Sequence, residues 1–148
     1  MKATVIAEGA ERTFVLVFET GDEVIDEITG FARDQHLTAA HFVGIGALSR
    51  LTVGYFDWET KTYDHIAIHE QVEVLSLAGD IAEHRGQAAI HAHIVVGKRD
   101  GSAHGGHLVE AEVRPTLEVV LSEAPAHLRK RYDPTTGLAL IDLREDAS

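Results

Sequence analysis

Two histidine motifs carry the side chains of this sequence that are best suited to chemistry. His91-Ala92-His93 stands in residues 90–96, a run rich in β-branched side chains that predicts a strand. Because alternate residues of a strand point to the same face, His91 and His93 are expected side by side. A third histidine, His107, follows two glycines. Neutral imidazoles that converge on one point are ligands for a divalent metal ion.

The turn between these motifs decides whether His107 joins the first two histidines. Residues 98–102 contain an Asp-Gly pair and therefore predict a tight turn. A two-residue loop would pair Ile94 with His107 and place His107 on the face opposite His93. A three-residue loop with Gly101 in the left-handed conformation would pair His93 with His107 directly. We favour the second register, and a β-bulge at the two glycines before His107 would also bring the imidazoles together.

The available donor atoms indicate zinc or a similar first-row ion. The sequence has no cysteine, so histidine, aspartate and glutamate are the remaining ligands. Three neutral histidines with an open fourth position form the arrangement of a catalytic zinc, which lowers the pKa of bound water towards ~7 or polarises a carbonyl group. Glu118 lies in an apolar strand, on the face opposite Leu117 and Val119. It is a candidate catalytic acid or base, or the partner of a ligand histidine; an exposed position or a salt bridge is equally open.

The other histidines fit surface or interface positions better than a metal site. His104 belongs to the same hairpin, but its position near the loop predicts exposure to solvent. Four more are scattered along the chain: His41, His65, His69 and His84.

The elements that must position the candidate ligands are mostly strands. Besides the histidine hairpin, the patterns predict strands at residues 12–19, 39–48, 51–57, 62–69, 72–78, 116–121 and 138–143. The strand at 12–19 is expected to be buried on both faces, and the chain is expected to enter the strand at 116–121 through Pro115. Residues 83–86 predict a polar turn, and the basic cluster at 129–131 a solvated helix or turn.

The pattern of residues 22–36 predicts a helix. Asp22 is the expected N-cap, and the helix should end near His36. The residues that fall on one face at helical spacing are Val24, Ile28, Phe31 and Ala32. With eight or nine strands and one main helix, the sequence predicts a single α+β domain built on a largely antiparallel sheet.

The composition sets limits on location and partners. A net charge of −11, from 13 basic and 24 acidic residues, disfavours binding to duplex DNA, whose non-specific affinity is electrostatic. The apolar stretch before the first acidic residue, Glu8, is too short for a signal peptide. No apolar run reaches the ~20 residues of a membrane span. We therefore expect a cytoplasmic protein without a membrane partner.

Taken together, the motifs resemble the PPC family, the "plants and prokaryotes conserved" domain. The likeness covers about residues 10–145, within one domain over 1–148. It rests on these segments: Gly44-Ile45-Gly46-Ala47, Gly54-Tyr55-Phe56-Asp57, Glu73-Val74-Leu75-Ser76-Leu77 with Gly79, His91-Ala92-His93, Gly105-Gly106-His107-Leu108 and Glu118-Val119-Val120.

The resemblance implies a fold, an assembly and a partner. Members form homotrimers, and the plant members, which carry AT-hooks, are described as DNA-binding. The fold is similar to that of acetolactate decarboxylase, which binds zinc through three histidines; matched by motif, the ligands here are His91, His93 and His107. This sequence has no Arg-Gly-Arg-Pro segment of an AT-hook, so we expect no appreciable DNA binding.

Three functions stay open at this point. The first is a homotrimer with a three-histidine divalent-metal site that acts on a small substrate. The second is a DNA-binding or regulatory protein, and the third is a structural trimer module whose histidines line an interface.

Overall fold

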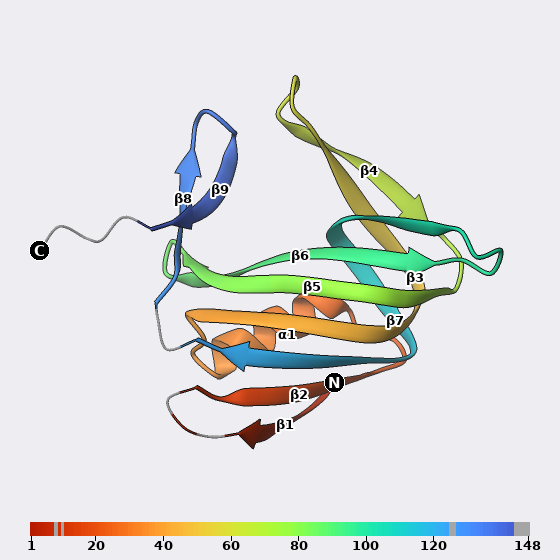
Figure 1. Ribbon diagram of the computed structural model, residues 1–148, viewed down its shortest axis with the longest axis horizontal. Helices are drawn as coiled ribbons and strands as arrows, with labels where there is room; N and C mark the ends of the chain where they lie inside the picture. The colour runs from red at the N-terminus through yellow and green to blue at the C-terminus, as the bar shows by residue number, and fades with distance from the viewer. Residues whose placement is uncertain (8, 10, 125–126, 144–148) are drawn as a thin grey trace, which may run out of the picture.

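The computed structural model describes residues 1–7, 9, 11–124 and 127–143, and in these residues the chain forms nine strands and one helix (Figure 1). The helix, α1, spans Val24–Asp34. The strands are β1 (Lys2–Ala7), β2 (Thr13–Glu19), β3 (Ala39–Asp57), β4 (Thr62–Ile68), β5 (Val72–His84), β6 (Gln87–Gly97), β7 (Ala103–Glu123), β8 (Arg129–Asp133) and β9 (Leu138–Asp142). The predicted α+β fold, with a largely antiparallel sheet and one main helix, is confirmed.

Four strands close a ring at the centre of the sheet. β3 pairs with both β5 and β7, and β6 pairs with the same two strands from the other side. β2 and then β1 extend the sheet beyond β7, while β4 pairs with the far end of β3. The register between β3 and β7 shifts three times, and such bulges bend strands. β5 pairs with β6 along its whole length, while β7 pairs with it only from His93 to Gly97, so His93 is held from both edges and His91 from one.

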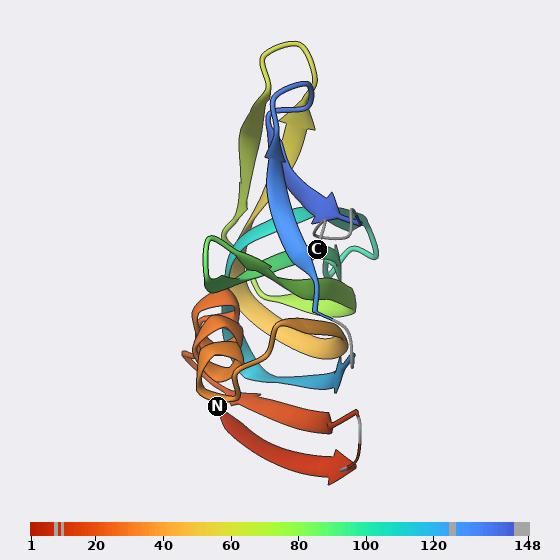
Figure 2. The same ribbon diagram turned by 90° about the vertical axis from the view of Figure 1, so that its left-hand side faces the viewer.

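The helix seals one face of the sheet (Figure 2). Its side chains Val24, Ile28 and Ala32 are buried, as the helical spacing predicts. Phe31 packs edge-on against Phe14 of β2, with ring centroids 5.1 Å apart. In the part of the chain that the structure describes, no helix is long and apolar enough to cross a membrane.

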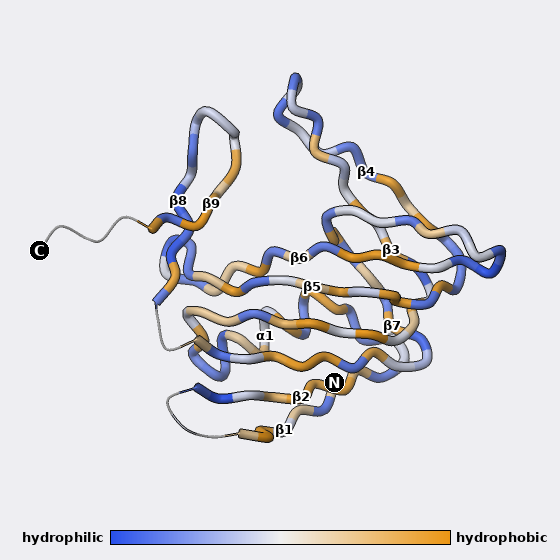
Figure 3. The backbone as a smooth tube through the Cα atoms, viewed as in Figure 1, coloured by the Kyte–Doolittle hydropathy of each residue, from blue (hydrophilic) through white to orange (hydrophobic). Residues whose placement is uncertain are grey.

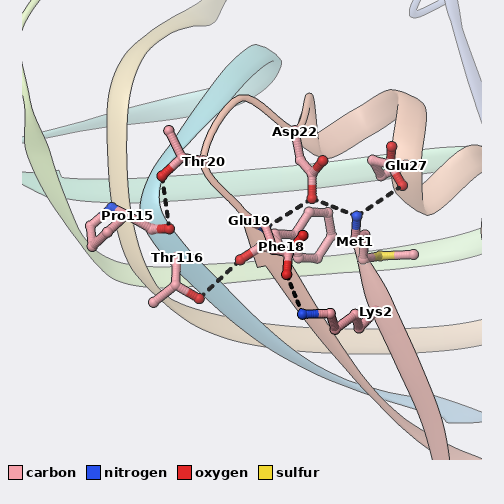
Figure 4. A network of polar contacts seen from close by, with 9 residues as sticks. All are labelled: Met1, Lys2, Phe18, Glu19, Thr20, Asp22, Glu27, Pro115 and Thr116. Carbon is pink, nitrogen blue, oxygen red and sulfur yellow. Dashed lines mark hydrogen bonds and ion pairs between the residues drawn. The ribbon is translucent and has the colours of Figure 1, made fainter.

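The helix begins one residue later than predicted. Glu23, not Asp22, is the N-cap, and its side chain accepts a hydrogen bond from the backbone N–H of Asp26. Asp22 instead accepts from the backbone N–H of Glu19 and pairs with the amino group of Met1, 2.7 Å away (Figure 4). Asp22 therefore ties β1 to the end of β2, and the next carboxylate takes the capping position.

Several strands are longer than the local patterns predict. The two segments 39–48 and 51–57 form one strand, β3, and segment 116–121 is the end of β7, which runs on through Pro115. β5 continues to His84, so the turn predicted at 83–86 is reduced to two residues with positive φ, Arg85 and Gly86. Pairing on both edges satisfies the backbone groups of these long strands, which a local pattern does not reveal.

Other corrections concern burial and the ends of the described chain. Residues 12–19 alternate in burial, with Phe14, Leu16 and Phe18 inside, so β2 is not buried on both faces. The basic cluster at 129–131 lies in β8, which forms a hairpin with β9 that stands out from the body of the fold (Figure 1). The sequence patterns did not predict β1. In the structure its six residues are all exposed, so no buried face gives them an alternating pattern.

Some apolar residues of the central strands, which Figure 3 colours orange, are exposed and so lie on the outer face of the sheet, opposite the core. Val120 of β7 lies opposite Val43 of β3, and Val43 lies opposite Ala78 of β5. Ala78 in turn lies opposite His93 of β6. We call the exposed residues Val43, Ile45, Ala78 and Val120 the outer stripe; its row across the sheet ends at a candidate metal ligand.

Candidate metal site

The β6–β7 hairpin has the three-residue loop that brings His107 opposite His93. The backbone N–H of Lys98 donates to the carbonyl of Ser102, and that of Gly101 donates to the carbonyl of Lys98, both at 2.9 Å. Gly101 has a φ of +83°, a left-handed conformation that glycine adopts without a steric cost. The ladder then runs without a shift to the pair His93 and His107. The favoured register is confirmed, and no bulge is needed.

The three predicted ligands form one cluster. His91, His93 and His107 each offer a nitrogen, and these atoms all lie within 4.8 Å of one another. The ring centroids are 5.2 to 5.5 Å apart. At a tetrahedral zinc with Zn–N of ~2.1 Å, ligand nitrogens stand about 3.4 Å apart. Small side-chain rotations would therefore close the cluster on an ion.

Close approach of two strands sets the depth of His107. It pairs with Gly54 of β3, and a Cβ at the preceding Gly106 would lie 2.8 Å from the carbonyl oxygen of Gly54. The ring of Tyr63 covers His107, with centroids 4.8 Å apart and planes at 31°. A Cβ on Gly54 would lie 2.7 Å from the Tyr63 ring. Glycines on both strands thus allow the aromatic ring to shield one ligand from water.

Partial desolvation lowers the pKa of two of the imidazoles. Desolvation, with the nearby His91 and His93, lowers the pKa of His107 to about 4. Desolvation followed by the charge of His91 also lowers the pKa of His93. Metal-binding histidines must be deprotonated, so these environments suit ligands at neutral pH.

One nitrogen of the cluster is buried without a hydrogen-bond partner. Nδ1 of His107 is buried and has no hydrogen-bond partner among the described residues. A buried polar atom without a partner is costly, and most such atoms in native structures are satisfied in some way. Together with the lowered pKa of the ring, this unsatisfied nitrogen leaves His107 with a lone pair that a metal ion can take up.

Sequence reasoning missed the residues around the cluster. An open groove of about 430 Å³ runs beside His91 and His107. Its walls include Tyr63, Asp80 and Lys130, together with apolar residues of β9. These residues come from four strands, so no local spacing could have grouped them. The sequence offered one signal, the charged residue Asp80 within the otherwise apolar stretch 77–82.

The remaining histidines lie outside the cluster. His104 is exposed and close to Ser102, with its Nε2 3.3 Å from the hydroxyl oxygen. His84 is half-buried and its Nδ1 lies 3.1 Å from the carbonyl oxygen of Lys130. His41 and His65 are exposed on β3 and β4. The cluster of three closely spaced ligand atoms contains none of them.

Glu118 also lies outside this cluster. It is exposed, and its ladder partners are Val17 of β2 and Ile45 of β3. It shares the outer face with His93, but β5 and β3 separate β7 from β6 along that path. At ~4.8 Å per strand, this is roughly 14 Å along the sheet. Its role in catalysis stays a prediction.

A comparison of the sequence with known protein families agrees with the fold. Residues 6–125 match the model of the Plants and Prokaryotes Conserved (PCC) domain. The chain belongs to this family. The family expected from the sequence motifs is therefore confirmed.

Two solved structures of this fold are 28% and 33% identical in sequence to this chain. A "putative DNA binding protein" of Bacteroides thetaiotaomicron is 28% identical, with a TM-score of 0.85 over 95% of this chain and 96% of that one. The metal-containing protein AF0104 of Archaeoglobus fulgidus is 33% identical, with a TM-score of 0.81 over 87% of this chain and 91% of that one.

Two more distant comparisons limit what can be transferred. Alpha-acetolactate decarboxylase of Bacillus subtilis has a TM-score of 0.56 at 11% identity, over 74% of this chain and 51% of that one. That likeness shows a related fold alone. The bifunctional protein GlmU of Synechococcus is 30% identical in an alignment of 142 residues that covers 94% of this chain. The chain spans about a fifth (22%) of the length of that curated relative.

Proposed function

We propose that this protein is a homotrimer in which each subunit binds one divalent metal ion, zinc by preference, through His91, His93 and His107. The observation that carries the proposal is the convergence of three ligand nitrogens within 4.8 Å. The low pKa of His107 and its orphaned Nδ1 support it. The name of the Archaeoglobus relative, a metal-containing protein, supports it further.

The donor set suggests what the site does. Imidazole nitrogen is a borderline ligand that suits zinc among the common ions, and no thiolate competes. An ion held by three neutral histidines keeps an open position, lowers the pKa of bound water towards ~7 and polarises carbonyl oxygens. The groove beside His91 and His107, at about 430 Å³, has the volume of a small-molecule site. We therefore propose chemistry on a small substrate at this position.

The outer stripe supports self-assembly. Val43 is 56% exposed, Ile45 64% and Val120 43%. Contiguous exposed apolar side chains on a sheet mark a protein–protein interface. We assign this face to contacts between copies of the chain, with the number three taken from the family resemblance. Because the stripe ends at His93, the interface would border the metal site.

This assembly gives Glu118 a place in the proposal. Its carboxylate lies on the outer face beside the stripe, opposite Ile45. Within one chain it is separated from the histidines by two strands, so it would act as acid or base only on the site of a neighbouring copy. A carboxylate in an apolar contact face also needs a partner there.

A DNA-binding role is the second candidate, favoured by the name of the Bacteroides relative. Affinity for duplex DNA depends on lysine and arginine contacts to phosphate. This chain has a net charge of −11. Arg12, Arg50 and Arg131 form ion pairs with Glu123, Glu112 and Asp142. We rank DNA binding below the metal site for this reason.

Metal analysis of freshly purified protein without a histidine tag tests the first proposal. We expect close to one zinc ion per chain, and calorimetry of the chelator-treated protein should show the same stoichiometry. A protein that neither contains nor binds a divalent ion would overturn the metal site and favour a structural module. A metal-bound monomer would overturn the assembly alone.

A further inference from the structure

A line of three polar side chains leads away from the histidine cluster. Nδ1 of His91 lies 3.3 Å from Oδ2 of Asp80, and Oδ1 of Asp80 lies 2.8 Å from Nζ of Lys130. His91 belongs to β6, Asp80 to β5 and Lys130 to β8. The line therefore connects the predicted metal site with the β8–β9 hairpin.

The contact between Asp80 and His91 is set by the sheet. The two residues are direct partners in the β5–β6 ladder, so both side chains stand on the same face. An ionised carboxylate is an acceptor only, and it therefore favours the tautomer of His91 that carries its proton on Nδ1. That tautomer leaves the lone pair of Nε2 for an ion. Carboxylates commonly orient metal-binding histidines in this way.

Lys130 is the least exposed of the three side chains. Its side chain is only 6% exposed, against 29% for Asp80 and 46% for His91. A nearly buried ammonium group needs a partner, and Asp80 provides it. The backbone of the hairpin is placed by a bridge between Glu83 of β5 and Arg129 of β8. The β8–β9 hairpin, which stands out from the fold, thus places the ammonium group of Lys130 beside Asp80, the partner of His91.

We propose that Asp80 and Lys130 are positioning residues for the metal, which makes the β8–β9 hairpin part of the metal centre. The inference rests on the proposed metal site. Lys130 holds Asp80 in place, and Asp80 fixes the ring and tautomer of His91. Coupling of this kind is reciprocal, so an ion bound at the histidines stabilises the docked hairpin.

The experiment measures zinc affinity of four variants by competition with a chromogenic chelator. Asp80→Asn keeps the shape but removes the charge, and should raise the zinc dissociation constant about 10- to 100-fold. Lys130→Met keeps the length but removes the charge, with an expected rise of about three- to tenfold. Lys130→Arg restores the charge and should bind zinc more tightly than the methionine variant.

Arg131→Ala is the matched control on the same hairpin. Arg131 pairs with Asp142 of β9, not with Asp80. This variant loosens the hairpin without touching the line to His91, and its zinc affinity should stay within about twofold of the native value. If Arg131→Ala weakens binding as much as Lys130→Met, the hairpin acts by general stability, and the positioning role is wrong.

Hydrogen exchange gives a second readout that does not depend on activity. Zinc should slow exchange of the amides in β8 and β9 of the native protein, and Asp80→Asn should abolish that effect. Native zinc binding with unchanged affinity in Asp80→Asn and Lys130→Met would overturn this inference and leave the proposed function standing. Failure of the native protein to bind zinc would overturn both.

Discussion

His93 lies directly opposite His107 across the β6–β7 ladder, with ring centroids 5.5 Å apart and planes at 80°. His91 completes the cluster from the same strand as His93, two residues earlier. One hairpin therefore supplies all three candidate ligands, and its loop determines whether they meet.

Replacing one of the three clustered histidines, His93, should remove most of the metal binding. His93 is one of three candidate ligands whose ring centroids are almost equally spaced, so His93→Ala is expected to weaken zinc binding about a hundredfold or more. His104→Ala is the matched control, because His104 belongs to the same hairpin but lies outside the cluster. It should bind zinc within about twofold of the native protein. Calorimetric titration of both variants decides, and equal losses would contradict the observed register.

The metal-free protein should lose stability in a defined acid window. The pKa of His107 is about 4 in the folded chain, against an ordinary value of 6.5. Between these values the unfolded chain binds more protons than the folded one, so the free energy of unfolding falls as the pH drops from 6.5 to 4. Outside this window the contribution of His107 is constant.

Urea unfolding of chelator-treated protein at a series of pH values measures this effect. His107→Gln cannot titrate, so the difference between the native protein and this variant isolates the contribution of one histidine. A difference that does not change between pH 4 and 6.5 would show that His107 is not desolvated in the folded protein.

Charge in the outer stripe should dissociate the assembly. Val43→Glu places a carboxylate in the middle of the proposed interface, where burying it unpaired is costly. Light scattering should show a fall from three times the chain mass of 16.1 kDa towards a single copy. Ile66→Glu is the control, since Ile66 is 50% exposed on β4, outside the stripe. A native protein that is monomeric at micromolar concentration would remove the trimer.

Two glycine substitutions should change stability in opposite directions. Gly101→Ala forces a residue with a Cβ into a φ of +83° and should cost about 1–2 kcal/mol in free energy of unfolding. Gly30→Ala, inside α1, has room for a Cβ, the nearest atom being Arg33 Nη2 at 3.8 Å. It should stabilise by about 0.5–1 kcal/mol. Denaturant titration measures both, and a neutral Gly101→Ala would mean that the loop accepts another conformation.

The chain should not bind DNA appreciably at physiological salt. Its net charge of −11 repels the phosphate backbone. Titration of a labelled AT-rich duplex at ~0.15 M salt, where the Debye length is about 8 Å, gives the test. Sub-micromolar binding that weakens steeply with added salt would favour the DNA-binding alternative.

The sequence by itself determined the parts of the site that depend on short-range geometry. The alternation of a strand aligns His91 with His93, and the Asp-Gly turn limits the hairpin to two loops, of which the three-residue one with Gly101 at positive φ was favoured and is found in the structure. The helix face of Val24, Ile28 and Ala32 follows from the same kind of local periodicity. These features were predicted because backbone geometry relates residues that are close in the chain.

Only the tertiary structure decided which distant side chains surround the cluster. Asp80 meets His91 because β5 pairs with β6, and Lys130 is buried because β8 returns to the edge of β5. The local pattern around Lys130 predicted a solvated segment, and the pattern around Glu118 did not reveal its distance from the histidines. Strand pairing between remote segments is selected by burial of the whole sheet, a global free energy that no short window of sequence contains.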